Sequence, residues 1–229
     1  IDGNTFSFGA SSSKNYSKLI PFKTSEKISV QLLSEKLNKK VVYLEDEKLL
    51  SELNNEFYSI PADSLYKEML FESDNFIAEQ ILLMVSQKIS DTLNTEIAIS
   101  QTQKNNFEDL PDEIFWVDGS GLSRYNLATP RSMVKILEKI INLKSQKRLS
   151  GILPKAGKEG TIKNFLLDKN AIVYAKSGSM RNNYSLSGFL ITKKGKRLLF
   201  SFMNSNYTVS SKKLKAEMEQ VLLRVINKY

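Results

Sequence analysis

Two polar triplets carry the residue types of an acyl-transfer site, Ser73-Asp74-Asn75 and Lys176-Ser177-Gly178. A Ser hydroxyl can relay a proton and an Asn amide can orient a carbonyl group. A Lys cation can hold a substrate carboxylate and favour deprotonation of a neighbouring hydroxyl. Each triplet alone also fits a structural role, helix capping for the first and a strand end for the second. The case for chemistry therefore depends on both occurring in one chain, in this order.

The composition restricts which groups can take part. The chain has 229 residues, 41% of them hydrophobic, which is enough for one substantial core or for a core with a small appendage. It contains neither Cys nor His, so disulfides, a Ser-His-Asp triad and a His-based metal site are excluded. No cofactor and no metal are expected. The base of any acyl transfer must be another residue, and Lys is the natural candidate.

The net charge of +8 favours a solvated basic surface. The Lys residues are scattered, and no stripe of basic and aromatic residues accompanies them, so no nucleic-acid partner is expected. A basic surface would also suit the anionic polymers of a cell envelope. No apolar run reaches the length of a membrane span. Because the chain opens at Ile1 without Met or a signal peptide, we expect a part of a longer or processed protein.

The first triplet is expected at a junction between two helices. One helix begins near Asp63 or Ser64, and apolar residues at helical spacing over 77–89 predict another directly after Asn75. The polar stretch 91–113 is expected to be irregular. Other helices are expected at 24–37 after a Thr24 or Ser25 cap, at 130–141 after a Thr129 cap, at 162–167 and at 214–226.

The second triplet is expected to end a strand. Strands are predicted at 41–44, 171–176, 185–192 and 197–203, with Lys194-Gly195 as the hairpin turn between the last two. Strands followed by a terminal helix indicate a mixed α/β domain with an antiparallel sheet.

A strand edge beside a cleft lets backbone groups pair with an extended peptide. Ser177 offers a hydroxyl to a substrate carboxylate, and Gly178 lets a substrate backbone approach closely. The N–H of Ser179 is a candidate donor to an oxyanion.

Three strings in this order, at 72–79, 118–126 and 175–180, resemble the D-alanyl-D-alanine carboxypeptidase/endopeptidases of the penicillin-binding protein 4 type. Residues 186–189 extend the match, and Ser177 stands where many members carry Thr. The resemblance implies a β-lactamase/transpeptidase-like fold of the α/β (α+β) class, with an antiparallel sheet flanked by helices. It is close over 58–229 and loose over 1–57.

The resemblance also implies a reaction. A serine attacks the D-Ala-D-Ala or cross-link amide of peptidoglycan stem peptides, and water hydrolyses the resulting acyl-enzyme. β-Lactam antibiotics acylate the same serine. Such hydrolases work on the cell wall, in the periplasm or cell envelope. Ser73 and Asn75 would form the second motif of the site and Lys176 the third. The stem-peptide pocket would involve Ser120, Leu122, Arg124 and Met180, although the Ser-Gly-Leu-Ser-Arg string also fits a structural turn and Arg124 a buried salt bridge.

The nucleophile of such a site belongs to a Ser-x-x-Lys string, and Ser11 with Lys14 forms one ahead of the first triplet. A helix must hold these two residues on one face. Here Pro21 closes the segment, and only ten residues precede Ser11. We therefore expect the nucleophilic serine to lie outside these 229 residues. The 229-residue chain by itself would then be an inactive fragment.

The expected organisation has two parts. Residues 1–57 would be the end of an accessory or inserted domain, and 58–229 the C-terminal part of the transpeptidase-like domain. Two other functions stay open: a non-catalytic module that binds peptidoglycan or a partner, and a compact β-lactamase that uses Ser11 and Lys14. Labelling by penicillin and hydrolysis of a β-lactam would distinguish them.

Overall fold

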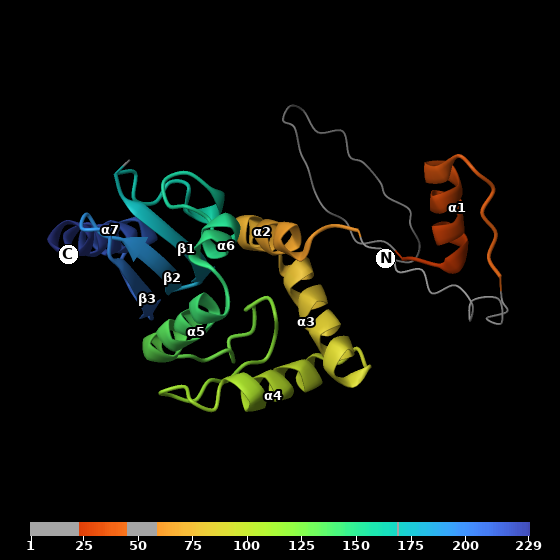
Figure 1. Ribbon diagram of the computed structural model, residues 1–229, viewed down its shortest axis with the longest axis horizontal. Helices are drawn as coiled ribbons and strands as arrows, with labels where there is room; N and C mark the ends of the chain where they lie inside the picture. The colour runs from red at the N-terminus through yellow and green to blue at the C-terminus, as the bar shows by residue number, and fades with distance from the viewer. Residues whose placement is uncertain (1–22, 45–58, 169) are drawn as a thin grey trace. The chain divides into compact units, whose positions relative to one another are not determined.

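The computed structural model of the protein describes residues 23–44, 59–168 and 170–229 (Figure 1). The chain divides into two compact units, Ile1–Tyr58 and Ser59–Tyr229. In the first unit, helix α1 (Glu26–Leu37) begins where the Ser25 hydroxyl accepts the Ile28 N–H, which confirms the predicted cap. The strand predicted at 41–44 is wrong. Among the described residues of this unit no second strand pairs with it, and a strand needs a partner.

The second unit contains seven helical segments and one sheet among its described residues. In chain order they are α2 (Ala62–Glu72), α3 (Asn75–Ser90), α4 (Thr95–Asn106), α5 (Pro130–Leu143), α6 (Gln146–Ile152), the 3-10 turn η2 (Gly160–Ile162), β1 (Ile172–Met180), β2 (Asn183–Ile191), β3 (Arg197–Ser205) and α7 (Ser211–Lys228). The strand order is β1-β2-β3, and both pairs are antiparallel. The predicted mixed α/β class, with an antiparallel sheet flanked by helices, is confirmed. None of the described helices combines the length and the apolar character needed to cross a membrane.

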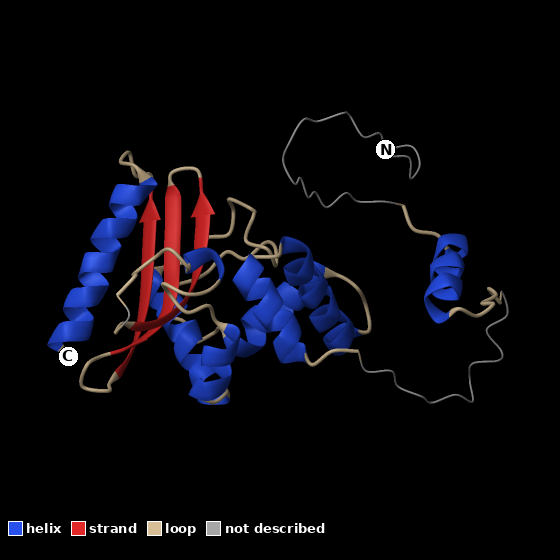
Figure 2. Ribbon diagram, turned by 90° about the horizontal axis from the view of Figure 1, so that it is seen from above, coloured by secondary structure: helices blue, strands red, loops and turns tan. Residues whose placement is uncertain are grey.

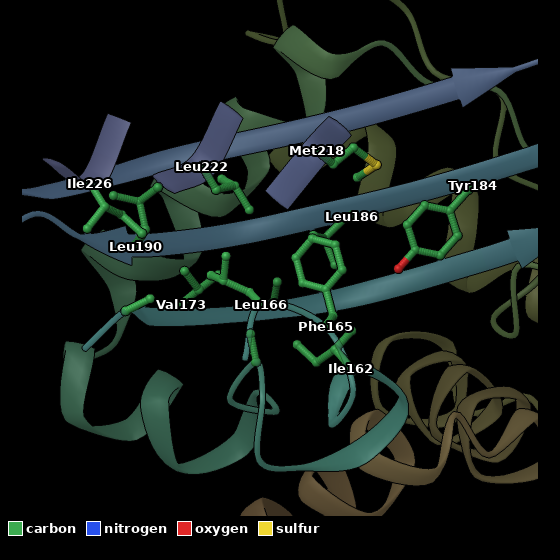
Figure 3. Packing of buried hydrophobic residues seen from close by; sticks show 13 residues of the cluster. Ile162, Phe165, Leu166, Val173, Tyr184, Leu186, Leu190, Met218, Leu222 and Ile226 are labelled. Atoms are coloured by element: carbon green, nitrogen blue, oxygen red, sulfur yellow. The ribbon is translucent and has the colours of Figure 1, made fainter. Parts of the chain in front are cut away.

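The sheet buries both of its faces because alternate residues of a strand point to opposite sides. On one face Val173, Ala175 and Leu186 are fully buried, and helix α7 covers them with Met218, Leu222 and Ile226 (Figure 3). On the other face the rings of Tyr174 and Phe189 stack 5.2 Å apart, beneath residues of α5 and α6. Two packed layers therefore fix the directions of the β1 side chains of Val173, Tyr174 and Ala175, and strand alternation extends this pattern to Lys176.

Strand β1 is longer than predicted. The Lys-Ser-Gly triplet lies inside it rather than at its end, because Gly178 and Ser179 continue the pairing with Ser185 and Tyr184. The chain turns only at 181–182, where Asn182 takes a positive φ of 59° that suits a tight hairpin. The hairpin turn at Lys194-Gly195 is confirmed.

Two helices lie where none was predicted. Helix α4 occupies the polar stretch 91–113, because the Asn94 side chain caps it at 2.8 Å from the Glu96 N–H and because Ala98 and Ile99 are buried against α3. Helix α6 follows a Ser145 cap. The helix predicted at 162–167 is wrong beyond its start, since only the short turn η2 forms.

Candidate active site

The first triplet lies at the junction between α2 and α3, as predicted. Ser73 ends α2 in the left-handed region, with φ 57° and ψ 47°, and its N–H donates to the Met69 carbonyl. The Asp74 carboxylate caps α3 by accepting the Ile77 N–H at 2.9 Å. A left-handed conformation costs a non-glycine residue about 1 kcal/mol. The junction therefore holds Ser73 at some cost in stability, and Asn75 is the first residue of α3.

The two triplets meet through Lys176. Its Nζ donates to Ser73 Oγ at 2.8 Å and to the Ser177 carbonyl at 2.7 Å, although Ser73 and Lys176 are 103 residues apart in sequence. Burial lowers the pKa of Lys176. A lowered pKa increases the fraction of neutral amine, the form that can accept a proton. The pair thus joins a hydroxyl to a nitrogen base without a His.

The outer edge of β1 is covered over only part of its length. The Ala156 N–H donates to the Val173 carbonyl, and the Ala175 N–H donates to the Pro154 carbonyl, so these residues direct their backbone groups outward. By alternation Ser177 and Ser179 do the same. No backbone group of the described residues pairs with that outer stretch. An extended peptide can therefore add to this edge.

The glycine of the second triplet faces open space. A Cβ placed on Gly178 would meet no heavy atom closer than the Ser185 Cβ, at 4.0 Å. A Cβ on Gly188, three positions after Ser185, the β2 partner of Gly178, would lie 2.0 Å from the Tyr174 carbonyl oxygen. Packing within the chain thus requires glycine at 188 and does not require it at 178.

Ser177 belongs to a small cluster of hydroxyl-bearing side chains that the sequence did not reveal. Its Oγ lies 2.8 Å from the Thr161 hydroxyl of η2. It also lies beside the phenol of Tyr184, whose pKa is raised by burial, while the Ser177 hydroxyl acts in the opposite direction. Thr161 belongs to no sequence motif, so only the packing of η2 places its hydroxyl beside Ser177.

The Ser-Gly-Leu-Ser-Arg string forms a turn built on Asp118. The Asp118 carboxylate accepts the N–H groups of Gly121 and Ser123, each at 2.6 Å. The Asn126 amide donates to the same carboxylate at 2.9 Å. Gly121 has a φ of 75°, which glycine adopts without steric cost. These bonds preorganise the turn before any ligand binds.

Glu79 clamps this turn to helix α3, and sequence reasoning assigned it no role. Its carboxylate accepts the Gly119 N–H at 3.1 Å and the Ser120 N–H at 2.9 Å. Glu79 lies one helical turn after Asn75, on the same side of α3. A Cβ on Gly119 would lie 2.7 Å from the Ala78 carbonyl oxygen, so the two backbones touch. The signal in the sequence was an acidic residue four positions after the motif asparagine.

The remaining predicted site residues make no hydrogen bond to Lys176 in the described part of the chain. Leu122 is 63% exposed, and Arg124 is exposed without an ion pair to any described carboxylate, so a buried salt bridge of Arg124 is wrong. Asn75 is exposed and its side chain makes no hydrogen bond with the described residues. Met180 is half-buried at the end of β1. Their roles toward a substrate stay predictions.

The candidate nucleophile Ser11, with Lys14, lies outside the described residues. Within the described segments, no group of three or more acidic side chains is placed to hold a metal ion.

An antiparallel sheet with a terminal helix on one face, and a serine from a helix junction beside a strand lysine, define a protein of the β-lactamase/transpeptidase-like class. A structure of the TLA-3 extended-spectrum beta-lactamase matches 79% of this chain with a TM-score of 0.55 at 15% identity, which shows the shared fold alone. The D-Ala-D-Ala carboxypeptidase 3 (S13) family matches residues 11–226. The chain belongs to that family.

Individual relatives agree with this assignment. The chain is 33% identical to the D-alanyl-D-alanine carboxypeptidase DacB of Haemophilus influenzae over 174 residues, which cover 71% of this chain and 36% of the relative. It is 28% identical to the carboxypeptidase DacB of Mycolicibacterium smegmatis over 66% of this chain and 35% of that one. The crystal structure of penicillin binding protein 4 from H. influenzae matches with a TM-score of 0.61 at 27% identity, over 72% of this chain and 39% of that chain. The chain thus spans less than half the length of these relatives.

Proposed function

We propose that this chain is the C-terminal part of a serine-type D-Ala-D-Ala carboxypeptidase/endopeptidase that acts on peptidoglycan stem peptides through an acyl-enzyme. The observation that carries the proposal is the 2.8 Å hydrogen bond from Lys176 Nζ to Ser73 Oγ. It joins both triplets of the family pattern into one site. The site then has a proton relay made only of Lys and Ser.

In the proposed reaction a serine Oγ forms a bond to the carbonyl carbon of the scissile amide. The serine proton passes to a basic group of the site, and the Ser73–Lys176 pair is suited to relay it to the leaving amine. The C–N bond breaks, and D-Ala or the cross-linking amine departs with that proton. Water then attacks the acyl-enzyme, releases the shortened peptide and restores the serine.

The edge of β1 would hold the substrate. The outward backbone groups of Ser177 and Ser179 suit an extended peptide, and the Ser179 N–H would donate to the oxyanion. The open space at Gly178 admits the peptide backbone. Lys176 and the Ser177 hydroxyl would bind the terminal carboxylate, and Asn75 would orient the substrate amide.

The turn at 118–126 would form the stem-peptide side-chain pocket. Its fixed conformation supports this role, because a pocket that is ordered in advance loses less entropy on binding. Ser120 is tied to α3, whereas Leu122 and Arg124 are free to contact a ligand. Met180 would line the pocket from the end of β1.

The same site would take β-lactams. One structure of H. influenzae penicillin binding protein 4 is a complex with a novel beta-lactam, and this chain matches it with a TM-score of 0.58 at 27% identity. A cell-wall substrate also places the protein in the periplasm or cell envelope.

We further propose that sequence outside these 229 residues supplies the nucleophile, and that residues 1–57 end an accessory domain. The experiment uses the polypeptide extended by its natural upstream sequence, with release of D-Ala from a stem pentapeptide as the readout. Lys176→Ala should lower kcat/KM at least 100-fold, and Lys212→Ala, which removes an exposed Lys of α7, should not change it. Equal activity of both variants would refute the assignment of Lys176.

A further inference from the structure

Charge is divided unevenly within the second unit. Residues 59–118, which form α2, α3 and α4, carry 3 Lys and Arg against 12 Asp and Glu, a formal net charge of −9. Residues 119–229, which form the sheet and α5, α6 and α7, carry 22 against 5, a net charge of +17. An acidic helical part and a basic sheet part therefore lie in one unit.

Ion pairs of the basic part are few among the described residues, and most of them join it to the acidic part. Of the four ion pairs among the described side chains, three join one part to the other: Asp63 with Arg148, Asp109 with Lys139, and Asp112 with Arg131. The fourth lies within α5. Most cations of the basic part are left without a carboxylate partner among the described residues.

Six of these cations gather at one end of the sheet. The Lys193 N–H donates to the Ile226 carbonyl at 3.0 Å, which ties the β2–β3 turn to the last turns of α7. Figure 2 shows this turn beside the C-terminal end of α7, with the β1–β2 turn at the opposite end of the sheet. Arg197 donates to Gln146 of α6 at 3.2 Å. The distal basic cluster consists of Lys147, Lys193, Lys194, Lys196, Arg197 and Lys228, all exposed.

The cluster has little acidic compensation. None of its six side chains forms an ion pair with a described carboxylate. The segments that carry the six cations, at 139–152, 190–200 and 220–229, contain no Asp or Glu. Clustered like charges repel one another, so they create a local positive potential that attracts an anionic ligand.

We infer that the distal basic cluster binds a soluble polyanion with closely spaced phosphate groups. The β2–β3 turn reads Thr-Lys-Lys-Gly-Lys-Arg over 192–197, with no apolar residue to enter a bilayer and no aromatic residue. The aromatic ring beside the cluster is that of Tyr229, and Lys228 Nζ already lies over it, 5.4 Å from its centroid. Flexible Lys side chains suit the repeated point charges of a phosphate polymer. Phosphate spacing, rather than a headgroup or a base, is then the recognised feature.

The cluster and the candidate site are separate on the sheet. Ile172, at the cluster end of β1, lies four residues before Lys176, about 13 Å along an extended strand. A polymer held at the cluster would leave the β1 edge at Ser177 and Ser179 open. The protein would thus be retained near an anionic polymer while its site remains accessible.

The test measures binding of the 229-residue chain to linear inorganic polyphosphate by fluorescence anisotropy at several NaCl concentrations. The triple variant Lys194→Gln, Lys196→Gln, Arg197→Gln should bind at least 10-fold more weakly at low salt. The slope of log affinity against log salt concentration should become less negative by about 2. Each lost phosphate contact removes about 0.7 from the magnitude of this slope. The matched control is Arg181→Gln, Lys212→Gln, Lys213→Gln, which removes three cations at the opposite end and should bind like wild type.

Equal weakening by the two triple variants would overturn the inference, since net charge rather than the cluster would then explain binding. No binding of wild type would also overturn it. Tighter binding, per phosphate, to anionic lipid vesicles or to a thymidine oligonucleotide would replace the polymer with a membrane or a nucleic acid. Lys176→Ala should leave polyphosphate binding unchanged, so this result is independent of the proposed peptidase activity.

Discussion

Lys176 and Ser73 face each other from two regions that are stabilised in different ways. Lys176 belongs to strand β1, in which the nearby residues Val173 and Ala175 are fully buried against α7. Ser73 belongs to helices with few buried residues, on which Phe76 is 71% and Met84 is 60% exposed. Packing places the lysine, whereas helix caps and polar contacts place the serine. The helical side of the site should therefore be easier to displace without unfolding the protein.

The largest expected effect tests the sheet side. Gly188→Ala should destabilise the protein by about 3 kcal/mol or more, because the new Cβ would lie 2.0 Å from the Tyr174 carbonyl oxygen. Gly178→Ala should change the free energy of unfolding by less than about 0.5 kcal/mol, because its Cβ meets open space. Urea unfolding measures both. Equal destabilisation by the two variants would contradict the difference in packing between Gly188 and Gly178.

The next effect tests the polar clamp on the helical side. Glu79→Ala should cost about 1–2 kcal/mol, because it leaves the N–H groups of Gly119 and Ser120 without their acceptor. Hydrogen exchange should rise at residues 119–123 and stay unchanged in β2. Glu72→Ala, which removes an exposed carboxylate, serves as the control. Unchanged exchange in the turn would show that Asp118 alone fixes it.

A smaller effect separates the backbone of Ser73 from its hydroxyl. Ser73→Gly should be more stable than Ser73→Ala by about 1 kcal/mol, because only glycine adopts φ 57° without cost. Both variants lose the hydroxyl, so both should lose D-Ala release in the extended polypeptide. If Ser73→Ala proved as stable as Ser73→Gly, the junction would not be strained. If either retained full activity, the hydroxyl would not be part of the proton relay.

The smallest effect is a pH dependence on the sheet side. Burial lowers the folded pKa of Lys176, so between that value and the ordinary 10.5 the unfolded chain binds more protons than the folded one. Stability relative to Lys176→Met should therefore rise with pH through this window and stop changing above 10.5. Lys212→Met, at an exposed position, should show no such rise. A difference that falls with increasing pH would contradict the burial of Lys176.

The sequence was most informative where short-range chemistry decides the structure. The caps at Ser25, Asp74 and Thr129, and the Lys194-Gly195 turn, follow from local hydrogen bonding and backbone preference. It failed where long-range packing decides. The polar stretch that became α4 has few apolar residues, yet burial of Ala98 and Ile99 adds to the Asn94 cap and orders it.

The candidate site shows the same division. Both triplets could be read from the sequence, since residue type and order define them. Their 2.8 Å contact, the Thr161 hydroxyl beside Ser177 and the Glu79 clamp could not, because each joins segments that only the tertiary fold brings together. The end of β1 was placed too early because the small polar residues after Lys176 resemble a turn, while pairing with β2 keeps them extended.

The most direct measurement is covalent labelling by a fluorescent penicillin, followed by mass spectrometry of the labelled peptide. The 229-residue chain should remain unlabelled, and the polypeptide extended by its natural upstream sequence should be labelled at an upstream serine, in a reaction that Lys176→Ala abolishes. Stable labelling of Ser11 in the 229-residue chain would contradict the proposal, because Ser73 and Lys176 would then serve a nucleophile that this chain contains.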